Sequence, residues 1–140
     1  MCNLYSIITN QEAMRRLFRV NYDRVGNLPS LPGIFPDQLA PVVRVDKDGE
    51  RALEMMRWGF PPPPKLGTRA VTNVRNTASS YWRPWLNPEF RCLVPATSFC
   101  EYTDSQPKVP HWFAPGRRSP AVRVRGYLAA VDRRAQERDA

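Results

Sequence analysis

The placement of proline limits the folding of this chain more than any other feature of its sequence. Fifteen of the 140 residues are proline, and more than half of them lie in residues 28–41 and in the run PPPPK at 61–65. Proline fixes its own φ angle and has no N–H to donate, so it ends helices and is restricted to strand edges and ends. We therefore expect short elements, and we expect residues 28–41 to form an ordered irregular loop without a regular element.

The stretches between the prolines predict several strands and one helix. In residues 10–20 the apolar side chains follow helical spacing behind Asn10, a favourable N-cap, so a short amphipathic helix is expected. Residues 41–60 predict two strands joined at Asp48-Gly49, the strongest hairpin signal in the chain. Further strand candidates are residues 3–8, 70–76 and 91–103. The expected fold is α+β, with a mostly antiparallel β core and a few short helices.

The charge is strongly basic and unevenly distributed. The chain has 21 Lys and Arg against 13 Asp and Glu, a net charge of +8, which favours a polyanionic partner such as nucleic acid. Half of this excess lies in residues 115–140, which contain 7 Arg, no Lys and few large apolar side chains. We expect one domain at 1–114 and a basic tail at 115–140 that is either disordered or the product of an out-of-frame reading.

Cysteine usage and hydropathy exclude several classes of protein. The three cysteines form no CxxC pair, which argues against a disulfide framework and predicts a reduced, cytoplasmic protein. Cys92 and Cys100 lie in apolar runs and fit buried structural thiols better than zinc ligands. No apolar stretch approaches the length of a spanning helix. We expect a monomer without metal, cofactor or membrane association.

Four stretches could carry chemistry when they are considered together. They are MCNLYS at the start, RWGF at 57–60, NVRN at 73–76 and RCLVPATSFCEY at 91–102. In this order and at this spacing they resemble the SOS response-associated peptidase (SRAP) family, whose members attach covalently to abasic sites in single-stranded DNA. The resemblance covers about residues 1–114. The C-terminal part of the family is not found, so the domain is expected to be incomplete at that end.

The resemblance implies a catalytic set of Cys2, Asn73 and Glu101. After loss of Met1, Cys2 would carry a free α-amine and a thiol, which together can condense with the aldehyde of an opened abasic site to a thiazolidine. Glu101 matches the family's glutamate and would move protons, and Asn73 matches the asparagine that orients the reacting groups. From spacing alone, Glu101 could be an ordinary exposed glutamate at a strand end, and Asn73 a turn amide.

Three further residues are candidates for DNA contact. Arg75 matches the family's arginine and could bind a phosphate, or it could form a surface ion pair. Alternation along a strand would place it on the same face as Asn73. Trp58 could stack on a base or belong to the core. In SYWRPWL, Arg83 lies between aromatic residues as in nucleic-acid-binding surfaces, whereas the prolines of the longer stretch SSYWRPWLNPEF indicate a packed loop.

One expected catalytic group is missing, and this leaves the enzymatic activity open. The family's downstream histidine, in a His-x-Arg-Met-Pro context, is not found. The single histidine, His111, lies ten residues beyond Glu101; it is expected at a strand start and receives no role. The resemblance implies a cysteine-dependent peptidase that removes its own Met1 and shows lyase-like chemistry at abasic sites. The alternatives are a non-catalytic basic fragment that binds single-stranded DNA and an inactive truncated product.

Overall fold

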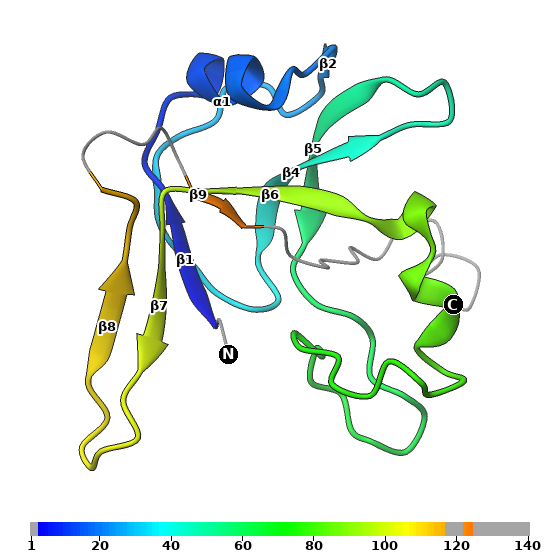
Figure 1. The fold of residues 1–140 in the computed structure, drawn as a ribbon, viewed down its shortest axis with the longest axis vertical. Helices are drawn as coiled ribbons and strands as arrows, with labels where there is room; N and C mark the ends of the chain where they lie inside the picture. Colours follow the sequence, from blue (N-terminus) through cyan, green and yellow to red (C-terminus); the bar gives the residue numbers. More distant parts are fainter. Residues whose placement is uncertain (1–2, 117–121, 125–140) are drawn as a thin grey trace.

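The computed structural model describes residues 3–116 and 122–124, and within them two β-sheets enclose most of the core (Figure 1). The strands are β1 (Leu4–Ile7), β2 (Tyr22–Asp23), β3 (Leu31–Ile34), β4 (Leu39–Val45), β5 (Arg51–Arg57), β6 (Cys92–Ala96), β7 (Ser98–Tyr102), β8 (Pro110–Phe113) and β9 (Val122–Val124). The helices are α1 (Gln11–Phe18) and two short 3-10 helices, η1 (Arg83–Leu86) and η2 (Pro88–Phe90).

The two sheets have the strand orders β3-β1-β7-β8 and β2-β5-β4-β6-β9. Among the described strand pairs only β2–β5 is parallel, and the others are antiparallel. The expected α+β fold with a mostly antiparallel core and few helices is therefore confirmed. The hairpin of β7 and β8 stands at the outer edge of the first sheet, and α1 lies across one end of the molecule (Figure 1).

The predicted helix forms where its sequence signals place it. The side chain of Asn10 accepts a hydrogen bond from the backbone N–H of Ala13 at 2.7 Å, which satisfies one of the free donors of the first turn. Arg19 adopts a left-handed conformation (φ 52°) and ends the helix. Met14 and Phe18 face inward and are buried, so the helix is held by its apolar side.

The predicted hairpin is also confirmed. β4 and β5 pair along their whole lengths, from Leu39 opposite Arg57 to Val45 opposite Arg51. Asp46 closes the turn, because its Oδ1 accepts hydrogen bonds from the N–H groups of residues 48 and 50 at 2.9 and 3.0 Å. Gly49 has φ 82°, a conformation that glycine adopts without strain.

The core lies between the sheets and under α1. Its buried members are Tyr5, Ile7, Met14, Phe18, Ile34, Ala40, Val42, Val43, Leu53, Trp58, Cys92, Val94 and Ala96. Each large apolar side chain that is fully buried contributes about 1.5–3 kcal/mol to stability. β1 crosses this core, so its N-terminal end is held against the neighbouring strands.

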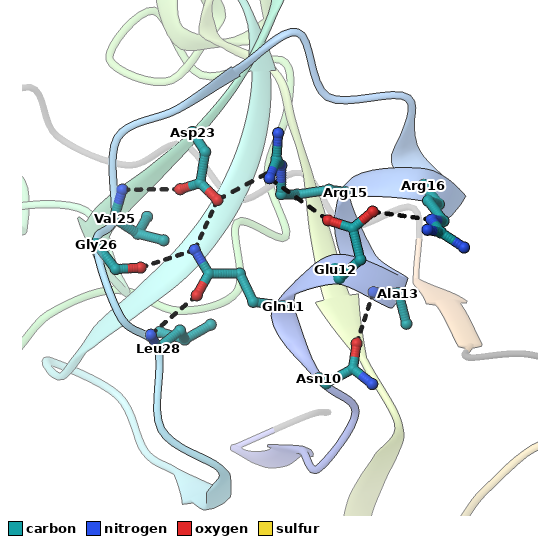
Figure 2. A network of polar contacts seen from close by, with 10 residues as sticks. All are labelled: Asn10, Gln11, Glu12, Ala13, Arg15, Arg16, Asp23, Val25, Gly26 and Leu28. Carbon is teal, nitrogen blue, oxygen red and sulfur yellow. Dashed lines mark hydrogen bonds and ion pairs between the residues drawn. The ribbon is translucent and has the colours of Figure 1, made fainter.

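Figure 2 shows how α1 is fixed to the loop that follows it. The amide nitrogen of Gln11 donates to Oδ2 of Asp23 at 2.6 Å and to the carbonyl oxygen of Gly26 at 2.7 Å. Its amide oxygen accepts from the N–H of Leu28 at 3.0 Å. One side chain thus bonds to the last residue of β2 and to two backbone groups of the loop that follows it.

Two sequence predictions in proline-rich or polar segments were wrong. Residues 28–41 were expected to contain no regular element, yet β3 forms there and pairs with β1. β3 is the edge strand of its sheet, so the missing N–H of Pro32 need not cost a bond to a second neighbour. Residues 70–76 were expected to be a strand, but only Val71 forms a bridge, to Phe60.

The strand expected at 91–103 is divided between the two sheets. β6 belongs to the five-stranded sheet and β7 to the four-stranded one, with Thr97 between them. The N–H of Thr97 donates to the carbonyl oxygen of Ser6 at 2.8 Å, and its hydroxyl donates to the same oxygen at 3.1 Å. These bonds to β1 fix the point at which the chain leaves one sheet and enters the other.

Part of the basic tail is in a sheet. β9 lies within residues 115–140 and pairs with β6, with Val124 opposite Val94 and Val122 opposite Ala96. The remainder of the prediction for this segment falls on residues 117–121 and 125–140, which lie outside the described residues.

Candidate functional site

The N-terminal end of β1 lies beside Glu101. In the β1–β7 ladder Leu4 is opposite Cys100, and continuing the antiparallel register by one residue brings Asn3 opposite Glu101. Cys2, which precedes Asn3 in the chain, lies outside the described residues. Glu101 is therefore the residue of β7 nearest to the start of the described chain.

The segment that contains Asn73 approaches the same place. The hydroxyl of Thr72 lies 3.5 Å from Oδ1 of Asn3, with Thr72 as the donor, and the amide nitrogen of Asn73 donates to that hydroxyl at 2.9 Å. Asn73 is half-buried. Asn3 thus lies between Glu101 on one side and the residues 72–73 on the other.

Gly59 allows this approach. Its φ is 120°, and a Cβ on Gly59 would lie 2.7 Å from the Cβ of Ala70, closer than real contacts allow. Directly after it, Phe60 and Val71 exchange two backbone hydrogen bonds of 2.9 Å each. The glycine therefore lets the chain at residues 70–71 pass against residues 59–60, which brings Asn73 toward β1.

Trp58 is a core residue. Its side chain is only 5% exposed, and its ring meets that of Tyr5 edge-to-face with centroids 5.1 Å apart. Of the two roles that the sequence allowed, the core role fits this environment. The proposed stacking of Trp58 on a DNA base does not fit a residue that belongs to the buried core.

Arg83 is exposed above a packed aromatic cluster. Phe60 meets Trp82 and Trp85 with ring centroids 5.3 and 5.6 Å apart, and Trp82 is buried. The prolines of this segment lie in the short helices η1 and η2. The aromatic residues of SYWRPWL are therefore packed together, while Arg83 is exposed.

Arg75 is exposed two residues after Asn73. The prediction that Asn73 and Arg75 share one face of a strand was wrong, since residues 72–76 are not in a strand. Both residues nevertheless lie on the same short segment, so DNA contact by Arg75 beside the site stays a prediction.

The remaining cysteines are structural. Cys92 and Cys100 are both buried and free of disulfide bonds, which confirms the expectation from their apolar surroundings. Within residues 3–116 and 122–124, no group of three or more His, Cys, Asp or Glu side chains could hold a metal ion. In the same residues, no helix is long and apolar enough to cross a membrane.

His111, for which the sequence predicts no role, lies in the site region. It is in β8, where it was expected at a strand start, and it pairs directly opposite Glu101 in the β7–β8 ladder. A signal for this pairing was available, because two β-prone runs on either side of a short proline-containing loop predict a hairpin. Counting outward from that loop would have placed the two residues opposite each other.

Comparison with known proteins identifies relatives of this chain. The model of the SOS response associated peptidase (SRAP) family matches residues 1–138, which extends beyond the residues 1–114 that carry the sequence resemblance. A crystal structure of a protein from Bordetella bronchiseptica matches the fold with a TM-score of 0.62 at 24% identity, over 82% of this chain and 58% of that one. This chain thus spans 58% of the length of that protein. No curated protein matches the chain significantly.

Proposed function

Since the chain belongs to the SRAP family, we propose that it recognises abasic sites in single-stranded DNA and attaches to them covalently through Cys2. Membership of this family indicates a role associated with DNA damage. The net charge of +8 supports a polyanionic partner.

The observation that carries the proposal is the position of Asn3. This residue follows Cys2 in the chain and precedes Leu4, which pairs with Cys100, the neighbour of Glu101; the hydroxyl of Thr72, the neighbour of Asn73, lies 3.5 Å from its Oδ1. These neighbours are far apart in the sequence and meet at one end of β1. A carboxyl group can move the protons that condensation of an amine with an aldehyde transfers, and a carboxamide can orient the reacting groups.

The proposed reaction begins with hydrolysis of the Met1–Cys2 peptide bond by the protein itself, which consumes one water and frees the α-amine of Cys2. The amine adds to the aldehyde carbon of the opened abasic site, and the carbinolamine loses water to give a Schiff base. The thiol of Cys2 then adds to the C=N carbon and its proton passes to the nitrogen, which closes a five-membered thiazolidine. The aldehyde oxygen leaves as water, so the sequence is balanced without an oxidant or reductant.

Glu101 and Asn73 have distinct roles in this proposal. The carboxylate of Glu101 takes a proton from the attacking amine and returns one to the departing hydroxyl, a contribution of about 10²–10⁴-fold to the rate. The carboxamide of Asn73 hydrogen-bonds the amine or the sugar hydroxyl and orients it. Arg75 and Arg83, both exposed, would bind the phosphates on either side of the lesion.

The test is formation of an adduct that survives a denaturing gel, with single-stranded DNA that contains one abasic site. We expect an adduct with the wild-type protein and none with undamaged DNA or with Cys2→Ala. Once Met1 is removed, Cys2→Ala and Cys2→Ser both keep the α-amine and lack the thiol, so each is expected to give a Schiff base that only borohydride traps, without a stable ring. Equal yields from Cys2→Ala and wild type, or an intact mass that retains Met1 in an active sample, would overturn the proposal.

A second candidate is non-covalent binding of single-stranded DNA. The exposed Arg75 and Arg83 and the basic composition favour it independently of Cys2. In that case Cys2→Ala should bind damaged and undamaged strands as the wild type does, with no adduct from either protein.

A further inference from the structure

An aromatic cluster extends from the interior to the surface near the segment that contains Asn73. Phe60 and Trp82 are its buried centre. The ring of Trp85 meets that of Phe60 edge-to-face with centroids 5.6 Å apart, and Phe90 meets Trp85 at 5.6 Å with an angle of 59° between the ring planes. Trp85 is half-buried and Phe90 is 42% exposed. The cluster therefore ends in two rings that solvent reaches.

The backbone that carries these two rings is held by short hydrogen-bonded turns. The N–H of Phe90 donates to the carbonyl oxygen of Asn87 at 3.0 Å, and the N–H of Arg91 to that of Pro88 at 3.1 Å. The guanidinium of Arg91 donates to the carbonyl oxygen of Leu86 from Nη2 at 3.0 Å and from Nε at 3.3 Å. Because the rings are already held in place, a ligand that stacks on them pays little entropy for ordering them.

The same cluster supports the candidate site. Val71 and Val74 are half-buried and pack against its buried centre. Val74 is joined by peptide bonds to Asn73 on one side and to Arg75 on the other. The aromatic cluster therefore adjoins the segment that is proposed to hold the lesion.

The chain around the two rings is rich in positive charge. Residues 69–100 contain four arginines and one acidic residue, namely Arg69, Arg75, Arg83, Arg91 and Glu89. Arg83 is exposed and precedes Trp85 by two residues. Aromatic rings next to guanidinium groups are the combination that binds single-stranded nucleic acid, because the rings stack on bases and the guanidinium groups pair with phosphates.

We propose that Trp85 and Phe90 form a stacking site for an unpaired base of the DNA strand next to the lesion, and that Arg83 binds a phosphate beside that base. This role rests on the proposed function for its ligand, single-stranded DNA, but it does not need the covalent step. Every base has a π face, so the site adds affinity without a strong sequence preference.

The test compares two strands that have the same phosphates and differ in their bases. One is an oligothymidylate, and the other is a strand of equal length made of tetrahydrofuran spacers, which has neither bases nor an aldehyde. Fluorescence anisotropy gives the ratio of the two Kd values for each protein. We expect the wild type to bind the oligothymidylate at least about fivefold more tightly, the smallest effect of stacking one base. In Trp85→Leu and in Phe90→Leu the ratio should fall severalfold, with the affinity for the base-free strand unchanged.

Two further variants separate stacking from charge and from general loss of an aromatic side chain. Arg83→Gln should weaken the binding of both strands equally and reduce the salt slope by about 0.7, with the ratio unchanged. Trp112→Leu is the matched control, because Trp112 is 46% exposed on β8 and lies outside the aromatic cluster. Its ratio should equal that of the wild type. Phe90 is exposed, so Phe90→Leu still decides the question if Trp85→Leu fails to fold.

Photocrosslinking locates the stacked base. A strand that carries 5-bromouracil in place of thymine is irradiated with the protein, and the products are digested with trypsin. Trypsin cleaves after Arg75 and Arg91 but not before Pro84, so both rings fall in the peptide of residues 76–91. We expect this peptide to carry the crosslink, and crosslinks found only in other peptides would contradict the proposal.

The remaining outcomes separate the stacking site from the covalent function. The stacking site is refuted if folded Phe90→Leu keeps the wild-type ratio, or if the wild type binds the two strands equally or binds neither. If light scattering shows a wild-type dimer that Phe90→Leu dissociates, again with an unchanged ratio, the rings form a contact between copies of the chain instead. If the ratio falls as expected but no abasic adduct forms, only the covalent function fails.

Discussion

At the scale of single residues, Glu101 and Arg75 should separate chemistry from binding. Glu101→Gln removes the proton-accepting carboxylate with little change of shape, so we expect adduct formation to slow on the order of a hundredfold while affinity for undamaged single strands is unchanged. Arg75→Ala should do the reverse: affinity falls, and the slope of log K against log salt decreases by about 0.7, the value for one phosphate contact to a single strand. Gel-based kinetics and fluorescence anisotropy measure the two quantities. If Glu101→Gln lost affinity as well as reaction rate, Glu101 would have a structural role. If the salt slope of Arg75→Ala equalled that of the wild type, Arg75 would not contact the DNA phosphates.

At the scale of elements, two contacts hold the parts of the site in place. Gly59→Ala forces a Cβ toward Ala70 in a backbone conformation that side chains rarely adopt, so we expect a loss of about 1–3 kcal/mol in urea unfolding and a slower adduct, because residues 70–73 must shift. Gln11→Ala removes the hydrogen bonds to Gly26 and Leu28 and one of the bonds to Asp23, whose Oδ2 keeps its ion pair with Arg15, and should cost about 1–3 kcal/mol. Asn27→Ala, an exposed change in the same loop, is the matched control and should cost less than about 0.5 kcal/mol. A Gly59→Ala protein with wild-type stability would show that residues 70–71 can move aside freely.

At the scale of the whole molecule, residues 115–140 contribute both a strand, β9, and half of the net charge. Deleting residues 115–140 removes β9 from the side of β6 and half of the net charge. We expect faster hydrogen exchange of the β6 amides, weaker binding to single-stranded DNA at low salt, and a covalent adduct that still forms at saturating DNA, because the site lies at the end of β1. Unchanged exchange in β6 would mean that β9 adds no protection, and an unchanged salt dependence would exclude the tail from DNA binding.

Local signals in the sequence were enough to predict the elements that depend mainly on residues close together in the chain. α1 was predicted because its cap and apolar spacing lie within one short segment, and the β4–β5 hairpin because Asp48-Gly49 determines the turn. The burial of Cys92 and Cys100 followed from apolar neighbours in the chain. The failures were β3, which depends on pairing with β1, and residues 70–76, where strand-like residues find a partner only at Val71.

The sequence by itself determined which chemical groups the protein has: an aminothiol precursor at Cys2, a glutamate, an asparagine, one histidine and an excess of positive charge. Only the tertiary structure decided which of them are neighbours. Glu101 lies opposite His111 and next to the Leu4–Cys100 pair because β7 is paired on both sides, and a strand register depends on contacts between residues far apart in the chain. The tertiary structure also decided that Trp58 belongs to the core, through its contact with Tyr5. The burial of a tryptophan depends on which other strands cover it, and its neighbours in the sequence do not show this.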